Sequence, residues 1–336
     1  MKSFSNSFFN LVAVLFIALG LGGCVSTNLP VATSSPWHEV NLDTDANPLD
    51  IAFIDESHGF LVGTNRLILE SKDAGKTWES RSLEIPTEEN FRLISIDFLG
   101  EEGWIAGQPG LVLHTADSGK NWTRIGLGNK LPGDPYLITT LGPDSAELAT
   151  TAGAVYRTND GGVSWEGKIT EASGGVRDLR RGKNGQYVSV SSLGNFYATL
   201  DPDDQAWMPH QRASSKRVQT IGFNSNGKLW MLSRGAEIRF ADQGGDLESW
   251  SKPIIPIVNG YNYLDLAEDP NGGIWAAGGN GTLLISKDSG DSWEEDSVGD
   301  AQASNLIRIL FDSSQGEGSE KGFVLGERGT LLRWEG

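Results

Sequence analysis

Seven of the eleven tryptophans in this 336-residue chain recur at nearly constant spacing. Their separations are 41, 44, 43, 42, 43 and 43 residues, and the seven are Trp37, Trp78, Trp122, Trp165, Trp207, Trp250 and Trp293. A repeat in the low forties, with turn-forming residues ahead of an aromatic residue, is typical of a propeller with one blade per repeat. The spacing therefore predicts a β-propeller.

Four of these tryptophans end the same eight-residue motif, Ser/Thr-x-Asp-x-Gly-x-x-Trp, at 71–78, 115–122, 158–165 and 286–293. In such a motif the Asp carboxylate accepts backbone N–H groups of the turn, the Gly adopts a positive φ, and the Trp begins the next strand. The motif resembles the Asp-box of sialidases, sortilin-type receptors and related propellers, in which the boxes lie away from the binding face. The repeats ending at Trp207 and Trp250 have lost it, which indicates that blades four and five have diverged.

Each complete repeat reads as four short strands separated by Gly-rich turns. In the second repeat the strands are expected at 92–98, 104–106, 111–114 and 122–125. The last repeat has only three, at 306–311, 323–325 and 330–333, and the segment 37–40 matches the missing fourth. We therefore predict an all-β, seven-bladed propeller closed by an N-terminal strand that pairs with the C-terminal blade, which leaves no open sheet edge. A six-bladed ring with one eccentric element is the alternative.

The N-terminal residues do not fit this repeat. Lys2 and an apolar run over 11–21 lead into Leu21-Gly22-Gly23-Cys24, the pattern of a lipoprotein signal peptide, and the run is too short to predict a membrane span. Cys24 is the only cysteine in the chain, and its place favours lipidation over a buried structural role. We expect residues 1–23 to be removed, 24–36 to form a lipidated polar tether, and 37–336 to form the propeller, which would act beside a membrane on its exported side.

The charge is strongly negative overall and unevenly distributed. A formal net charge of −17 argues against non-specific binding to nucleic acid or anionic lipid. The stretch 205–236 nevertheless contains no Asp or Glu, and it contains Arg212, Lys216, Arg217, Lys228 and Arg234. A solvated charge run is the simpler interpretation, and a binding surface is the other.

Propeller topology favours the binding surface. The loop that leads into a blade's first strand and the turn between its second and third strands emerge on one face. Arg177, Arg212, Lys216, Arg217 and Arg234 fall in or near such segments of blades four and five, and Arg66, Arg92 and Arg328 fall in those of other blades. Several cations are therefore expected to converge on one face.

Enzymatic residue patterns are missing. A sialidase needs three arginines, a Tyr nucleophile paired with Glu, and an acid/base Asp, but no Arg-Ile-Pro segment is present, and Tyr261, Tyr263 and Asp265 read as an ordinary first strand. The four histidines, His38, His58, His114 and His210, lack ligand spacing, so no metal is expected. The Gly-rich stretches lack the strand-turn-helix context of phosphate binding. The sequence predicts neither catalysis nor a cofactor.

Segments of blades four and five carry a more specific resemblance. They are 176–182, 191–197, 207–212, 215–219 and 229–235. Together they resemble the photosystem II stability and assembly factor family of cyanobacteria and chloroplasts, and the likeness spans essentially the whole mature chain, lipobox included. The resemblance implies a monomeric, lumenal, lipid-anchored chaperone of the thylakoid membrane, or of the periplasmic face of the plasma membrane. Its implied client is a newly made reaction-centre core subunit with a cleavable C-terminal extension.

The resemblance also implies which residues bind the client. The positions are Arg177, Arg180, Arg181, Arg212, Lys216, Arg217 and Arg234. Leu193 stands where the family commonly has Arg, and Lys216 replaces an Arg, which keeps the charge but loses the planar, bidentate fork. Arg180 and Arg181 lie near the end of their strand, so either face is open to them. A cell-envelope lipoprotein that binds glycan or scaffolds a complex is the alternative function, and a glycosidase comes behind it.

Overall fold

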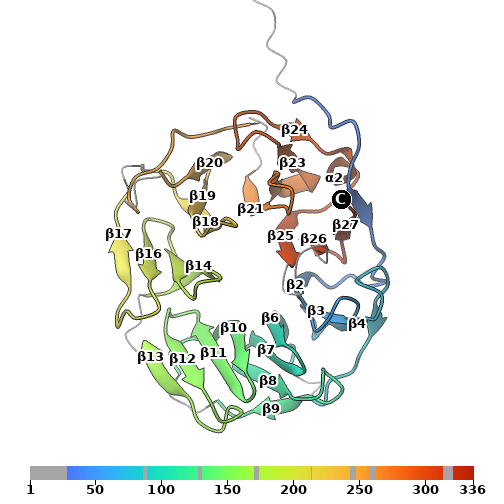
Figure 1. Cartoon of the computed structure of the whole chain (residues 1–336), viewed down its shortest axis with the longest axis vertical. Helices are drawn as coiled ribbons and strands as arrows, with labels where there is room; N and C mark the ends of the chain where they lie inside the picture. The colour runs from blue at the N-terminus through green and yellow to red at the C-terminus, as the bar shows by residue number, and fades with distance from the viewer. Residues whose placement is uncertain are drawn as a thin grey trace, which may run out of the picture.

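Figure 1 shows seven antiparallel sheets arranged as blades around a central channel, in a computed structural model of the chain. The structure describes residues 29–85, 89–127, 131–169, 174–212, 214–242, 247–256, 262–312 and 321–336. Within these residues, six sheets have four strands and one has three. The seven-bladed prediction is confirmed, and the six-bladed alternative is wrong.

The strands of the first four blades follow chain order from the channel outward. Blade 1 contains β2 (Pro48–Phe53), β3 (Gly59–Gly63), β4 (Ile68–Ser71) and β5 (Glu79–Ser80). Blade 2 contains β6 (Arg92–Leu99), β7 (Glu102–Gln108), β8 (Leu111–Thr115) and β9 (Thr123–Ile125). Blade 3 contains β10 (Pro135–Gly142), β11 (Ser145–Thr150), β12 (Val155–Thr158) and β13 (Glu166–Ile169). Blade 4 contains β14 (Val176–Arg181), β15 (Tyr187–Ser191), β16 (Tyr197–Leu200) and β17 (Met208–His210).

The remaining blades include the three-stranded sheet and the closure. Blade 5 contains β18 (Val218–Phe223), β19 (Leu229–Ser233) and β20 (Glu237–Phe240). Blade 6 contains β21 (Tyr263–Glu268), β22 (Ile274–Gly278), β23 (Leu283–Ser286) and β24 (Glu294–Glu295), with the 3-10 turn η1 (Gly279–Gly281) and the short helix α2 (Ser297–Asp300) beside it. Blade 7 contains β25 (Leu306–Asp312), β26 (Lys321–Gly326), β27 (Leu331–Trp334) and, from the other end of the chain, β1 (Trp37–Glu39).

Ring closure takes the predicted form. β1 pairs antiparallel with β27, with Trp37 opposite Trp334. Trp37 is buried against Trp275 of blade 6, edge to face with ring centroids 5.3 Å apart. The closing strand therefore completes both the blade 7 sheet and the apolar contact between blades 6 and 7.

Blade 5 departs from the expected four strands. In place of a fourth strand, the described residues between β20 and β21 make two isolated bridges with β20 and the residue after it, Ile238 to Ile254 and Ala241 to Trp250. Blades 4 and 5 both lack the Asp-box, yet blade 4 keeps its fourth strand β17, so loss of the box alone does not account for the missing strand. Trp250 still packs edge to face on Tyr197 of blade 4, at 5.7 Å between centroids, so the aromatic contact between blades is kept without the strand.

Apolar side chains fill the spaces between neighbouring blades, and the box tryptophans contribute to this core. Trp122 packs edge to face on Phe60 of blade 1 and on Phe98 of its own blade, at 6.1 and 5.8 Å between centroids. The turn before it lies directly against the same core, because a Cβ on Gly119 would be 2.5 Å from Phe60 Cζ. Gly119 also has a φ of +75°, so the box requires glycine there for both backbone conformation and space.

The Asp-box has the predicted clamp geometry. In blade 2, Asp117 Oδ1 accepts the backbone N–H of Asn121 at 2.9 Å and the Thr115 hydroxyl at 2.8 Å, and Oδ2 accepts the Asn121 side-chain amide at 2.7 Å. These hydrogen bonds, the Asn121 backbone bond first among them, lower the pKa of Asp117 to about 2. The outer strand begins one residue after the Trp, because the Trp still belongs to the turn and its indole packs between sheets.

Replacing Asp117 with alanine is expected to lower the free energy of unfolding by about 1 kcal/mol at pH 7, because the hydrogen bonds of an exposed turn carry small net energies. The pKa of Asp117 is lowered on folding, so its stabilising contribution is present above pH 4 and is lost as the pH falls toward 2. Denaturant unfolding of wild type and Asp117→Ala at pH 7 measures the difference. An unchanged midpoint would mean that the box is dispensable in this blade.

The described N-terminal segment does not hang free of the ring. Ala32 N–H donates to Glu295 O, and Glu295 N–H donates to Pro30 O, both at 2.8 Å, which fixes the chain along β24 at the outer edge of blade 6. Figure 1 shows this segment crossing from blade 6 toward blade 7. Among the described residues, no helix is long and apolar enough to cross a membrane. The predicted signal peptide and Cys24 lie outside the described residues.

Candidate partner-binding surface

We call one side of the ring the top face: it carries the loops that lead into each first strand and the turns between each second and third strand. Backbone hydrogen bonds join these segments from blade to blade. Val218 N–H donates to Gly194 O at 2.9 Å, Arg66 N–H to Phe91 O at 2.9 Å, and Gly329 N–H to Ala46 O at 2.9 Å. Side chains on this face therefore project from a fixed backbone frame.

Four exposed arginines stand on the top face. Arg217 and Arg234 belong to blade 5, where Arg234 N–H donates to Arg217 O at 3.0 Å and so places the two residues side by side. Arg92 begins the first strand of blade 2, and Arg328 lies in the turn between β26 and β27 of blade 7. None of the four guanidinium groups forms an ion pair with a described residue. Their charges are available to a partner.

Three other predicted residues lie at or near this face but are partly engaged within the protein. The Arg177 guanidinium donates to Val218 O at 3.2 Å and Gln219 Oε1 at 2.9 Å, and so joins blade 4 to blade 5. Lys216 Nζ lies 2.8 Å from the buried Glu237 carboxylate. Arg212 is half-buried and donates to Ser214 O at 3.1 Å and to Lys216 O. These three residues shape the surface around Arg217 and Arg234.

Arg180 lies elsewhere, on the channel wall toward the far end of β14. Its guanidinium is 2.8 Å from Asp265 Oδ1 of blade 6 and 3.2 Å from Asp178 Oδ2, and it covers the ring of Trp230 at 5.0 Å. Arg180 therefore connects blades 4, 5 and 6. Its charge is matched by carboxylates of the protein itself.

Arg181 is engaged in the same way between blades 3 and 4. Its Nε lies 3.3 Å from Glu147 Oε2, and the guanidinium covers the ring of Tyr187 at 5.6 Å. Tyr187 donates its hydroxyl to the same Glu147 oxygen at 3.0 Å. The structure thus separates Arg180 and Arg181 from the five other predicted residues and gives both a role in joining blades.

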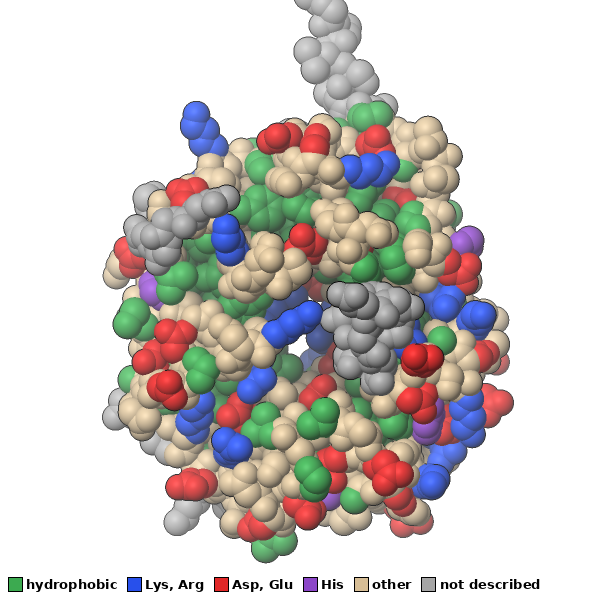
Figure 2. Space-filling model, viewed as in Figure 1, with side chains coloured by type: hydrophobic (Ala, Val, Ile, Leu, Met, Phe, Trp, Pro, Cys, Tyr) green, Lys and Arg blue, Asp and Glu red, His purple; other side chains and the backbone are tan. Residues whose placement is uncertain are grey.

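Aspartates on the first strands form a second set of links that the sequence analysis missed. Each carboxylate accepts a backbone N–H from the first strand of the next blade. The pairs are Asp50 with Ile96 at 3.0 Å, Asp97 with Thr140 at 2.6 Å, Asp178 with Ile221 at 3.4 Å, and Asp265 with Ile309 at 3.0 Å. Asp50, Asp97 and Asp178 border a central cavity of about 1400 Å³. Figure 2 shows the opening on one face, with lysine and arginine side chains at its rim.

Burial raises the pKa of Asp97 to about 7. A pKa raised on folding gives a contribution to stability that is complete below pH 4 and is lost as the pH rises through 7. Between pH 5 and 8 the free energy of unfolding of wild type should therefore fall by about 2 kcal/mol relative to that of Asp97→Asn. This value is smaller than the full shift of the Asp97 pKa gives, because the side chain is only half-buried. Denaturant unfolding of both proteins at the two pH values measures this. A constant difference would contradict the raised pKa.

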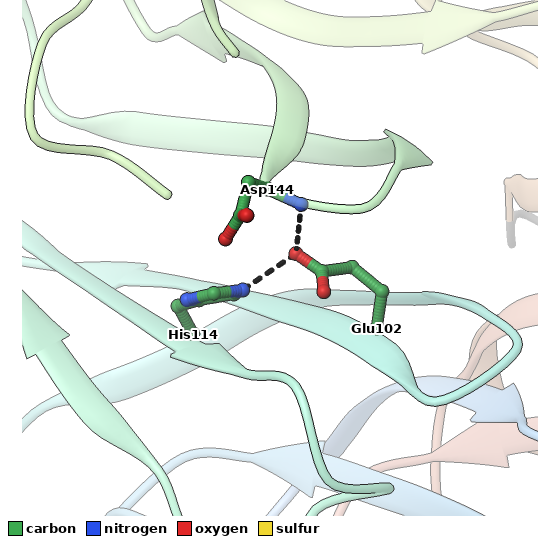
Figure 3. A group of neighbouring side chains, drawn as sticks. All are labelled: Glu102, His114 and Asp144. Carbon is green, nitrogen blue, oxygen red and sulfur yellow. Dashed lines mark hydrogen bonds and ion pairs between the residues drawn. The ribbon is translucent and has the colours of Figure 1, made fainter. Parts of the chain in front are cut away.

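Figure 3 shows Glu102, His114 and Asp144, whose potential ligand atoms lie within 4.8 Å of one another. Sequence spacing suggested no such group around His114. Glu102 Oε1 already accepts hydrogen bonds from His114 Nε2 at 2.6 Å and Asp144 N–H at 2.8 Å. The imidazole also stacks on Trp104, with centroids 4.1 Å apart. These contacts account for the group as a joint between blades 2 and 3, although its donor atoms are of types that bind metal ions.

The fold and this surface define a class: an Asp-box propeller with exposed arginines on its top face. The family described as "Photosynthesis system II assembly factor YCF48" matches residues 29–335. A protein of a Prochlorococcus marinus strain, named "Photosystem II assembly lipoprotein Ycf48", is 68% identical over 98% of this chain and 97% of its own. A protein of the same name from a Synechococcus species is 61% identical over 100% and 99%.

Two solved structures are also similar. One, described as "YCF48 bound to D1 peptide", is 42% identical, has a TM-score of 0.87, and the match covers 93% of this chain and 98% of that one. "YCF48 from Cyanidioschyzon merolae" is 36% identical, has a TM-score of 0.83, and the match covers 89% and 98%. The chain therefore belongs to the Ycf48 family of photosystem II assembly factors, and the resemblance seen in the sequence is confirmed.

Proposed function

We propose that this protein is a non-enzymatic chaperone that holds a newly made photosystem II reaction-centre core subunit by an acidic lumenal segment. The observation that carries the proposal is the pair Arg217 and Arg234, exposed side by side without an ion-pair partner among the described residues. A relative of known structure binds a D1 peptide, by its description, which supports a peptide segment as the ligand.

The chemistry of the top face suits a carboxylate ligand. Guanidinium groups donate paired, charge-assisted hydrogen bonds to carboxylates, and these are stronger than neutral hydrogen bonds. Arg177, Arg212 and Lys216 add positive potential around the pair while fixing the nearby backbone. The net charge of −17 over the whole protein disfavours docking of an acidic segment elsewhere.

A lipid anchor would keep this face near its client. We propose that residues 1–23 are removed, that Cys24 carries lipid, and that the protein works on the lumenal side of the thylakoid membrane or on the periplasmic face of the plasma membrane. The lipoprotein names of the relatives support the anchor. The chain is fixed to blade 6 from Pro30 onward, so residues 24–29 could span at most about 20 Å between a lipid on Cys24 and the ring. Anchoring would therefore raise the effective concentration of the propeller at the membrane.

Salt dependence tests the proposal. Binding of the mature protein to a synthetic peptide of the client's acidic lumenal C-terminal segment is measured by calorimetry at low and high ionic strength. We expect affinity to fall by about tenfold or more between about 0.05 and 0.5 M salt, because ions screen exposed charges. An affinity that does not change with salt would rule out recognition by the exposed arginines.

A further inference from the structure

Blade 4 presents an apolar surface on the top face. The turn between β15 and β16 exposes Leu193 at 57% and Phe196 at 37%. Among the described residues, the corresponding turns of the other blades expose no large hydrophobic side chain, and those of blades 1, 5, 6 and 7 expose Asn65, Arg234, Asn280 and Arg328 instead. Two large apolar side chains in water on one short turn are a feature that folding of the blade does not require.

The turn that carries them is held rigidly. Gly194 N–H donates to Ser191 O at 2.7 Å, and Ser191 Oγ accepts the N–H groups of Asn195 at 3.1 Å and Phe196 at 3.3 Å. Gly194 has a φ of +70°, and a Cβ there would be 2.4 Å from Val218 O, so the turn lies directly on the start of blade 5. Because the backbone is fixed, a ligand does not have to order it on binding.

The same contacts place the turn beside the free arginines. Val218 N–H donates to Gly194 O at 2.9 Å, and a Cβ on Gly194 would be 3.3 Å from Arg217 Cβ. Arg217 O in turn accepts the N–H of Arg234 at 3.0 Å. We call Leu193, Phe196, Arg217 and Arg234 the mixed strip. It runs from the apolar turn of blade 4 to the cationic turn of blade 5.

We propose that the mixed strip recognises a client peptide in which a large apolar side chain neighbours a carboxylate, with the apolar side chain on Leu193 and Phe196 and the carboxylate on Arg217 and Arg234. This inference rests on the proposed function and specifies its ligand. Charge complementarity selects an acidic peptide, and the apolar end of the strip selects among acidic peptides. Apolar contact also excludes water from the adjacent charged hydrogen bonds, which strengthens them.

Two short synthetic peptides of equal length and with the same carboxylates test this. The first carries a leucine beside an aspartate, and in the second that leucine is replaced by serine. We expect the mature wild-type protein to bind the leucine peptide about tenfold more tightly than the serine peptide. Leu193→Ser combined with Phe196→Ser should abolish this difference and leave affinity for the serine peptide unchanged. Val163→Ser is the matched control, because Val163 is 88% exposed within the Asp-box of blade 3, on the opposite face.

The outcomes separate this inference from the proposed function. If wild type binds both peptides equally and with strong salt dependence, the apolar contact is absent and the inference falls, while recognition by arginines stands. If wild type binds neither the two peptides nor the client's own segment, the proposed function falls and the inference falls with it. Thermal unfolding of the double variant is expected to match that of wild type, because both side chains are exposed. A match would show that the lost discrimination between the peptides does not reflect misfolding.

Discussion

Reversing both charges at Arg217 and Arg234, as Arg217→Glu with Arg234→Glu, is expected to weaken binding of the acidic client peptide by about 100-fold or more. Each guanidinium would contribute a charged hydrogen bond worth about 1.5 kcal/mol or more, and each glutamate adds repulsion. Stability should be nearly unchanged, because both side chains are exposed and form no ion pair with a described residue. Calorimetry with the peptide, beside thermal unfolding of both proteins, measures the two quantities.

The control for this change alters the net charge equally in another place. Lys76 lies in the Asp-box of blade 1, and Arg157 lies directly before that of blade 3, and both are exposed. Lys76→Glu with Arg157→Glu should leave peptide affinity within about twofold of wild type, since exposed charges beyond a Debye length are screened. If both double variants lost the same affinity, net charge rather than the top face would control binding.

Replacing Arg180 with methionine is expected to lower the free energy of unfolding by about 3 kcal/mol. The loss removes the cation that contacts the carboxylates of both Asp178 and Asp265, and Asp265 is 0% exposed. Removing one partner of a buried ion pair is far more costly than removing an exposed one. Denaturant unfolding at pH 7 measures the change, and Arg157→Met, an exposed Arg on β12, should differ little from wild type.

The same variant decides the role of Arg180 in binding. Held well below its unfolding temperature, Arg180→Met should bind the client peptide as wild type does, because its guanidinium faces the channel carboxylates rather than the top face. A variant of unchanged stability that had lost binding would instead make Arg180 part of the binding surface.

The propeller could be predicted because most blades repeat the same short strands, Gly-rich turns and inward-packed tryptophan. Tryptophan spacing gives the blade count, since every box places an indole between two sheets, as Trp122 does between Phe60 and Phe98. Closure followed from a count of strands, because the last repeat has three and the segment at Trp37 supplies the fourth. These features depend on local turns and on a period, both of which are visible in one sequence.

Contacts between blades could not be predicted in the same way. The family resemblance placed Arg180 among the partner-binding residues, and its position near the end of its strand left either face open. Its partner Asp265 lies in blade 6, and the sequence does not show that contact. The aspartate links of the first strands leave a weak signal in the sequence, because Asp50, Asp178 and Asp265 recur at multiples of the blade period. Free arginines such as Arg217 can be told from engaged ones only when their neighbours are known.

A pull-down from gently solubilised photosynthetic membranes tests the central claim most directly, with the mature wild-type protein beside the folded Arg217→Glu, Arg234→Glu variant as bait. The prediction is that wild type recovers the unassembled reaction-centre core subunit and that the variant does not, while the Lys76→Glu, Arg157→Glu control recovers as much as wild type. Equal recovery by all three proteins would contradict the assignment of client binding to the arginines of the top face.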